Sequence, residues 1–196
     1  MIALDIESSG LDSGSCGIWQ IGALELENPQ NSFFEEARID KEDIIIEEAL
    51  ELTGKTEADL RDSGKQSQKQ LILNFLEWAK TCKTRIMVGQ NIGWDISFIQ
   101  NKCIKYNILD KLRDAINFRA LDIHTLAQLR YKEKHGEFLL KEDGRSDMNL
   151  SNAIKFCGLE DTRAVMEDGK IVKEGTPHNA LEDAKLTAEC FRRLTK

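Results

Sequence analysis

Two acidic residues, Asp5 and Glu7, stand two positions apart in the apolar stretch that opens the sequence. Side chains alternate along a β-strand, so both carboxylates would point to one face and Leu4 and Ile6 to the other. Neighbouring carboxylates repel each other, and burial strengthens the repulsion unless a positive charge lies between them. Hard oxygen donors of this kind suit Mg²⁺ or Mn²⁺. Spacing alone still favours two solvent-facing acids at a strand end over a metal site.

Two further aspartates lie beside expected helices. Asp95 falls near the start of a helix, where the helix dipole favours an acid, so taken alone it is a simple first-turn residue. Asp183 borders the apolar stripe of the last helix, and a carboxylate aimed at the core is costly unless it is paired or metal-bound. Because no Lys or Arg on the same helix face offers a partner, the position of Asp183 favours a metal ligand.

His178 precedes Asp183 by five residues. On one continuous helix, about 100° of rotation per residue would point the two side chains well apart. His178 must therefore lie in the loop or first turn before the helix if it shares a site with Asp183, and Pro177 is consistent with such a break. Histidine is the natural general base near neutral pH, although a surface histidine is the simpler interpretation of this residue alone.

The expected elements form a meander of strands, followed by strands that alternate with helices. Apolar alternation and turn signals predict strands at residues 1–6, 18–26, 32–39, 85–88 and 118–123. Helical periodicity predicts helices at 44–52, 57–60, 67–80, 95–106, 124–131 and 149–156, and Thr176-Pro177 would open a last helix to about residue 194. Asp168-Gly169, between apolar residues, is a hairpin signal. This order predicts an α/β fold with a mixed sheet covered by helices.

The composition is that of one globular domain, with 196 residues, two prolines and no low-complexity segment. The net charge of −7 argues against a purely electrostatic nucleic-acid binder. It does not exclude a nuclease, because bound cations reverse the sign of a carboxylate cluster. Lys102, Lys105, Lys111 and Arg113 are candidates for a local phosphate track.

The five cysteines are odd in number and contain no CxxC pair, which favours reduced thiols in a cytoplasmic protein. No apolar run approaches the roughly 20 residues of a membrane span, and no signal peptide is visible. We therefore expect no membrane partner.

Three segments resemble, in order, the motifs of the DnaQ-like, or DEDDh, 3′-5′ exonucleases. Residues 5–11 (DIESSGL) are similar to the first motif, and residues 18–23 (IWQIGA) to the strand that follows it. Residues 89–98 (GQNIGWDISF) resemble the second motif, and residues 178–184 (HNALEDA) resemble the third in its histidine form, HxxxxD. One motif is weak evidence, but three in order over nearly the whole chain are a strong signal. Within the family, the sequence is similar to the proofreading subunits of bacterial DNA polymerase III.

The resemblance implies a ribonuclease-H-like fold, a five-stranded mixed sheet flanked by helices, in a single exonuclease domain over residues 1–196. It implies two divalent cations, Mg²⁺ or Mn²⁺, and hydrolysis of phosphodiester bonds from the 3′ end to release nucleoside 5′-monophosphates. By the family pattern, Asp5 would bridge both cations, while Glu7 and Asp183 would hold the cation on the nucleophile side. Asp95 would act largely through water, and His178 would deprotonate the attacking water.

The substrate would be the 3′ end of a nucleic acid, with single-stranded DNA favoured and RNA trimming as the alternative. The backbone N–H groups of Ser8, Ser9, Gly10 and Leu11 could hold that end, and Leu11 or Trp19 could stack on the last base. Asn91 would contact substrate or merely fix its turn. Asp122 resembles an acid common before the following helix and would support the metal-binding residues. A polymerase or another replication or repair protein is the expected protein partner.

Departures from the family pattern leave other interpretations open. Ser9 stands where the family often has Thr, and residues 160–175 exceed the usual short loop before His178. That segment would either form a hairpin beside the site that gates the substrate or a partner, or be a harmless surface insertion. One rival function is a catalytically silent binding module on the same fold. Another is a phosphatase with Asp5 as nucleophile, although no later Ser/Thr and Lys set supports it.

Overall fold

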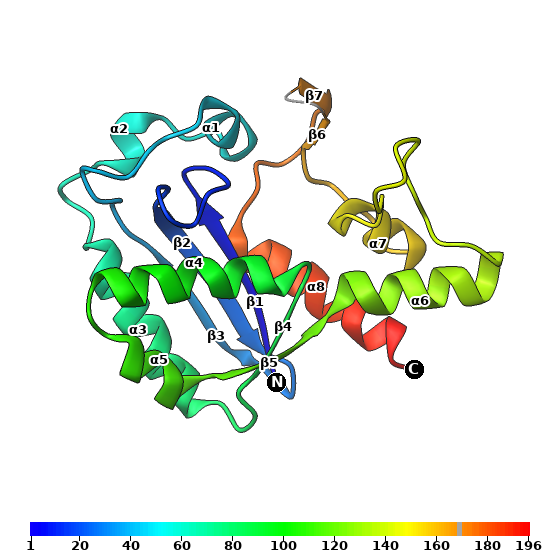
Figure 1. Ribbon diagram of the computed structural model, residues 1–196, viewed down its shortest axis with the longest axis horizontal. Coiled ribbons are helices and arrows are strands. Elements are labelled where there is room, and N and C mark those ends of the chain that lie inside the picture. The colour runs from blue at the N-terminus through cyan, green and yellow to red at the C-terminus, as the bar shows by residue number, and fades with distance from the viewer. Residues whose placement is uncertain (168–169) are drawn as a thin grey trace.

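The centre of the molecule is a five-stranded sheet with the strand order β3-β2-β1-β4-β5, seen in a computed structural model that describes residues 1–167 and 170–196 (Figure 1). The strands are β1 (Ile2–Ser8), β2 (Ile18–Glu25), β3 (Asn28–Glu36), β4 (Ile86–Gly89) and β5 (Asn117–Asp122). β1, β2 and β3 form an antiparallel meander, and β4 and β5 run parallel to β1. The predicted five-stranded mixed sheet is therefore confirmed.

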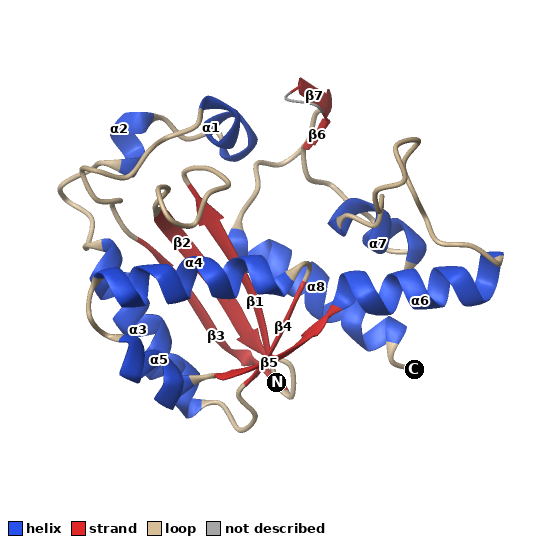
Figure 2. Ribbon diagram, in the orientation of Figure 1, coloured by secondary structure: helices blue, strands red, loops and turns tan. Residues whose placement is uncertain are grey.

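Helices cover both faces of this sheet (Figure 2). One face packs against α3 (Gln68–Thr81), α4 (Ile92–Lys105) and α5 (Leu109–Ala115), and the other against α6 (Ile123–His135), α7 (Leu150–Phe156) and α8 (Ala180–Leu194). Ile2, Leu4 and Ile6 enter the first core, whereas Ala3 enters the second. This alternation confirms that Asp5 and Glu7 project toward the α8 side of β1.

Two short helices and a hairpin lie outside these layers. The helices are α1 (Glu47–Thr53) and α2 (Glu57–Leu60), and the hairpin pairs β6 (Val165–Glu167) with β7 (Lys170–Lys173) in antiparallel register. In Figure 1 the tip of β1 points to the side of the molecule where α1, α2 and the hairpin lie. The strand pairing confirms the predicted hairpin, and its Asp168-Gly169 turn lies outside the described residues.

The last helix begins later than predicted. Thr176-Pro177 is not its start, because Asn179 is the N-cap and its side-chain oxygen accepts the N–H groups of Leu181 and Glu182 at 3.1 and 3.2 Å. Thr176 instead donates its backbone N–H to the Thr162 carbonyl at 2.8 Å. Helix α5, which is short and rich in charged residues, has no counterpart among the predicted elements. Within residues 1–167 and 170–196, no helix has the length and apolar character needed to cross a bilayer.

Candidate active site

Close packing between α8 and β2 places the last helix beside β1, the strand that carries Asp5. Asp5 lies opposite Gly22 in the register of β1 with β2. A Cβ on Gly22 would lie 2.1 Å from the backbone nitrogen of Leu181 and 2.2 Å from the carbonyl carbon of Ala180, so the site of contact requires glycine. The Ala180 N–H also donates to Gln20 Oε1 at 2.8 Å. The start of α8, and with it Asp183, is thereby fixed on the sheet.

Asp95 reaches the same place from the first turn of α4. Its side chain is 4% exposed, and its Oδ1 accepts the backbone N–H of Ile6, between Asp5 and Glu7, at 3.1 Å. The turn before α4 is closed by Asn91, whose φ of 55° is in the left-handed region. The Asn91 N–H donates to Asp122 Oδ1 at 3.0 Å. Asn91 therefore fixes its turn, and its contact with substrate stays a prediction.

Asp122 connects two helix starts. Besides the bond from Asn91, its Oδ1 accepts the His124 N–H at 2.9 Å and so caps α6. Its negative charge also raises the pKa of Asp95, after desolvation and the charge of Glu7. Asp122 thus fixes the turn before α4 and the start of α6, and its support of the metal-binding residues stays a prediction.

His178 lies in the loop before α8, as its spacing from Asp183 requires. One ligand atom each from Glu7, His178 and Asp183 lie within 4.8 Å of one another. His178 Nε2 is 2.9 Å from the Ala164 carbonyl, and a carbonyl can only accept, so Nε2 carries the hydrogen. Nδ1 is then the basic nitrogen, and it lies 3.4 Å from Asp183 Oδ2.

The acidic cluster resists full ionisation. Desolvation raises the pKa of Asp5 well above its usual range, and the charges of Asp183, Asp95 and Glu7 add to the rise. Desolvation and the charge of Asp183 raise the pKa of Glu7 to about 8, against the opposing charges of His178 and Arg163. Burial is also the main cause of the raised pKa of Asp95. The positive charges of His178 and Arg163 are therefore too few to offset the burial and mutual repulsion of these carboxyl groups.

The pKa of His178 is raised as well. Desolvation alone would lower it, but the hydrogen bond and charge of Asp183, the Ala164 carbonyl and the charge of Glu7 together outweigh that effect. A general base with a pKa above its ordinary value holds its proton more strongly once it has taken it. The role of His178 as the base that accepts a proton at Nδ1 stays a prediction.

Arg163 corrects one inference drawn from the sequence. No cation shares the Asp183 face of α8, yet Arg163 Nη1 reaches in from the segment before β6 and donates to Asp183 Oδ2 at 2.9 Å. Both side chains are buried, at 5% exposure each. The pairing lowers the cost of burying Asp183, so its burial is weaker evidence for a metal than the sequence indicates. Oδ1 of Asp183, however, is buried and has no hydrogen-bond partner among the described residues.

The residues at this edge of the sheet fit a divalent cation. Four carboxyl groups supply hard oxygen donors, three of them have raised pKa values, and Asp183 Oδ1 is an orphaned buried acceptor. A cation at such a place would satisfy that acceptor and offset the repulsion between the acids. Asp5, Glu7, Asp95 and Asp183 are the residues that could hold it.

The loop between β1 and β2 presents part of the predicted substrate contact. Leu11 is 82% exposed, and its carbonyl accepts the indole N–H of Trp94 at 3.2 Å, which fixes the loop tip against α4. Gly10 is required by its surroundings, since a Cβ there would lie 2.6 Å from Ile46 and 2.7 Å from Cys16. Ser8 Oγ donates to the Gly10 carbonyl at 2.6 Å. Gly10 and Leu11 therefore keep their predicted role as candidates.

Trp19 does not fit its predicted role. It is 1% exposed and packs with Ile39 and Leu60, and the Lys55 ammonium lies 5.3 Å from the centre of its ring. A nucleotide base cannot stack on a ring that is covered on all sides. The tryptophan belongs to a small core that anchors the segment after β3.

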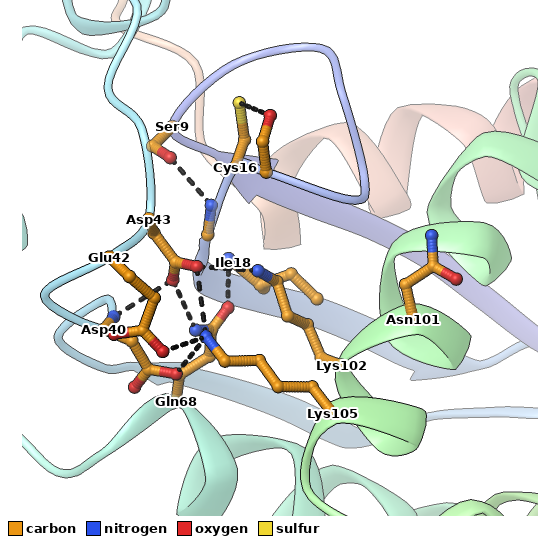
Figure 3. A network of polar contacts seen from close by, with 12 residues as sticks. Ser9, Cys16, Ile18, Asp40, Glu42, Asp43, Gln68, Asn101, Lys102 and Lys105 are labelled. Carbon is orange, nitrogen blue, oxygen red and sulfur yellow. Dashed lines mark hydrogen bonds and ion pairs between the residues drawn. The ribbon is translucent and has the colours of Figure 1, made fainter.

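The predicted phosphate track is also wrong for two of its members (Figure 3). Lys102 is 2% exposed and pairs with Asp43 at 2.9 Å, while Lys105 pairs with Asp40 at 2.6 Å and with Glu42 at 2.9 Å. These ammonium groups are occupied by acids of this chain. The network fixes the segment that also bonds the β1–β2 loop, where Ser9 Oγ donates to the Ile44 carbonyl at 2.6 Å.

Comparisons with known proteins identify the family of this chain. The model of the RNase T exonuclease family matches residues 2–191. A curated relative, the PolC-type DNA polymerase III of Caldanaerobacter subterraneus subsp. tengcongensis, is 26% identical over 193 residues, which are 98% of this chain and 11% of that protein. The chain thus spans about a tenth of the length of that relative.

Solved exonuclease structures share the fold. Escherichia coli exonuclease I in complex with a dT13 oligonucleotide superposes with a TM-score of 0.72 at 16% identity, over 100% of this chain and 40% of that one. A 3′-exonuclease solved for recognition of a histone mRNA stem-loop gives 0.65 at 15% identity, over 98% and 62%. The expected ribonuclease-H-like architecture is confirmed by these neighbours. With a family match that spans almost all of its length, the chain belongs to the RNase T/DnaQ-like exonuclease family.

Proposed function

We propose that this chain is a metal-dependent 3′-5′ exonuclease that hydrolyses phosphodiester bonds, with single-stranded DNA as the favoured substrate and nucleoside 5′-monophosphates as products. Residues 1–196 would form a single exonuclease domain. The observation that carries the proposal is the convergence of Asp5, Glu7, Asp95, Asp183 and His178 at one edge of the sheet, from three separate stretches of the sequence. Membership of the exonuclease family supports it.

Each residue would have a distinct part in the reaction. Two Mg²⁺ or Mn²⁺ ions, when bound, would activate water and offset the negative charge that develops on the scissile phosphate. Asp5, Glu7, Asp95 and Asp183 would hold the ions, with Asp5 central because all three other acids act on its pKa. His178 would take the proton of the attacking water on Nδ1, while the Ala164 carbonyl keeps Nε2 protonated and the ring oriented.

The 3′ end would enter beside the β1–β2 loop. Backbone N–H groups at Gly10 and Leu11 would hold the terminal nucleotide, and the exposed Leu11 side chain would contact its base. The Ser9 N–H is excluded from this role because it donates to the Gly17 carbonyl at 2.8 Å. Ser8 would act indirectly, by closing the turn through its bond to Gly10.

DNA is favoured because the curated relative is a DNA polymerase and the neighbouring exonuclease I is bound to a dT13 oligonucleotide. The histone mRNA neighbour supports RNA trimming as the second candidate. The polymerase relative also supports a replication or repair protein as partner of this chain.

A labelled-oligonucleotide assay tests the proposal. Wild-type protein with Mn²⁺ or Mg²⁺ should convert a 5′-labelled strand to a ladder of shorter products, and release mononucleotide from a 3′-labelled strand. Asp5→Asn should abolish both, whereas Asp110→Asn should not, because Asp110 is 99% exposed and pairs only loosely with Arg113 at 3.7 Å. A panel of single- and double-stranded DNA and RNA then identifies the substrate.

Three outcomes would contradict the proposal. Equal lack of trimming by wild type and Asp5→Asn would favour a silent binding module. Internal cleavage products would exclude an exonuclease. A phosphorylated Asp5 trapped with a phosphate monoester would favour the phosphatase alternative.

A further inference from the structure

The base of the β6–β7 hairpin is tied to the chain that leads into α8. The Ala164 N–H donates to the Thr176 carbonyl at 2.9 Å, and the Thr176 N–H donates to the Thr162 carbonyl at 2.8 Å. A Cβ on Gly175 would lie 2.4 Å from the carbonyl carbon of Arg163, so the two backbones are in close contact. Backbone packing therefore holds Arg163 beside the acidic cluster.

The guanidinium of Arg163 is shared between two acids. Nε donates to Asp161 Oδ1 at 3.0 Å, and Nη2 donates to Asp161 Oδ2 at 2.9 Å and to Ser151 Oγ at 3.2 Å. Nη1 donates to Asp183 Oδ2 at 2.9 Å. Asp161 thus binds Nε and Nη2 of the guanidinium in a bidentate arrangement, while Asp183 binds Nη1.

We propose that Arg163 sets the affinity of the site for divalent cations, by serving as a built-in counter-ion to Asp183, and that Asp161 moderates this effect. The proposal rests on the proposed function, since it takes the acidic cluster to be a metal site. Arg163 lies at the base of the long segment before His178, so this base contacts the acidic cluster directly.

The geometry determines the sign of each residue's effect. Arg163 occupies Oδ2 of Asp183 and leaves Oδ1 for a cation. A bound cation would stand close to the guanidinium, and two like charges in a buried site repel. Arg163 therefore weakens cation binding but offsets the repulsion among the acids when no cation is present. Asp161 draws the guanidinium charge away from Asp183, so it favours cation binding.

Two matched variants test the proposal, because Arg163→Gln and Asp161→Asn each remove one charge and keep a planar hydrogen-bonding group. Calorimetric titration of the purified chain with Mn²⁺ should give about tenfold tighter binding for Arg163→Gln and about threefold to tenfold weaker binding for Asp161→Asn. Thermal unfolding in EDTA should show a lower Tm for Arg163→Gln, and Mn²⁺ should raise that Tm by more than it raises the wild-type Tm. Arg163→Lys, which keeps the charge, should bind Mn²⁺ within about threefold of wild type.

The proposal would be overturned if the Mn²⁺ affinity of both charge-removing variants shifted in the same direction, or if neither shifted. Arg163 would then have a structural role only. Should Arg163→Gln not fold, Asp161→Asn decides alone, because affinity equal to or tighter than wild type contradicts the predicted sign. If the wild-type protein trims DNA but the Mn²⁺ affinities of both variants equal that of the wild type, this proposal alone is refuted. A wild-type protein that binds no Mn²⁺ refutes the metal site, and this proposal with it.

Discussion

A single methyl group at Gly22 should disconnect the two halves of the acidic cluster. Gly22 lies opposite Asp5 across β1 and β2, and the start of α8 packs directly on it. In Gly22→Ala the new Cβ would lie 2.1 Å from the Leu181 nitrogen, whereas ordinary van der Waals contact begins at 3.4 Å. The obstacle is backbone, which cannot rotate away as a side chain does. The start of α8 must therefore move outward by about 1 Å or more.

Both stability and activity should suffer. Overpacking of a well-packed core costs about 1–3 kcal/mol, and the alanine recovers roughly 0.5–1 kcal/mol through its lower unfolded-state entropy. We expect a net loss of about 1 kcal/mol in the free energy of unfolding, measured in urea with EDTA. Because Asp183 and His178 move with α8 relative to Asp5, the single-turnover rate should fall about 10²-fold, the usual effect of a displacement near 1 Å.

Gly93 is the matched control for stability. It lies in α4, and a Cβ there would meet nothing within 4 Å. Gly93→Ala should therefore stabilise the protein by up to about 1 kcal/mol through helix propensity alone. The reasoning is refuted if Gly22→Ala unfolds at the wild-type free energy and trims at the wild-type rate, because α8 would then not depend on contact with β2.

Three further predictions concern charge. Asp43→Asn should lower the free energy of unfolding in urea by about 3–5 kcal/mol, because it leaves Lys102 buried without its charged partner. The control Arg113→Ala changes an exposed ion pair and should lower it by at most about 1 kcal/mol. Equal losses in the two variants would contradict this prediction. The pKa of Glu7 is raised from its ordinary 4.5 to about 8, so its contribution to stability is present below about pH 4.5 and lost as the pH rises toward 8. The free energy of unfolding of the metal-free protein should fall across this pH range, and added Mn²⁺ should restore it. A free energy of unfolding that rises with pH would refute the raised pKa of Glu7. His178→Ala should reduce turnover about 10²–10⁴-fold with Mn²⁺ affinity largely kept, and collapse of that affinity would make the histidine a ligand.

The sequence predicts those features that depend on local periodicity. Alternation along β1 places Asp5 and Glu7 on one face without any knowledge of the partner strands, and the structure agrees. Rotation along a helix requires His178 to lie outside α8, which is also what the structure shows. The joint position of Asp95 with these residues does not follow from periodicity, and it was the resemblance to known motifs that predicted it.

Features that depend on distant contacts could not be predicted in this way. The partner of Asp183 is Arg163, and the two are brought together by the backbone pairing of residues 162–164 with Thr176. A lysine at position 102 is expected at the surface because buried lysines are rare. Its partner Asp43 comes from a loop 59 residues earlier, which no local pattern connects to it. Trp19 is an equally good strand residue whether it faces solvent or a core.

The long segment before His178 has two parts with different consequences. Its base contributes directly to the acidic cluster, since Arg163 binds Asp183 and the Ala164 carbonyl orients His178. Backbone bonds between residues 162–164 and Thr176 hold both of these residues in place. The base of the segment therefore contacts both the third acid and the histidine, and the protein's metal affinity should depend on residues 161–164.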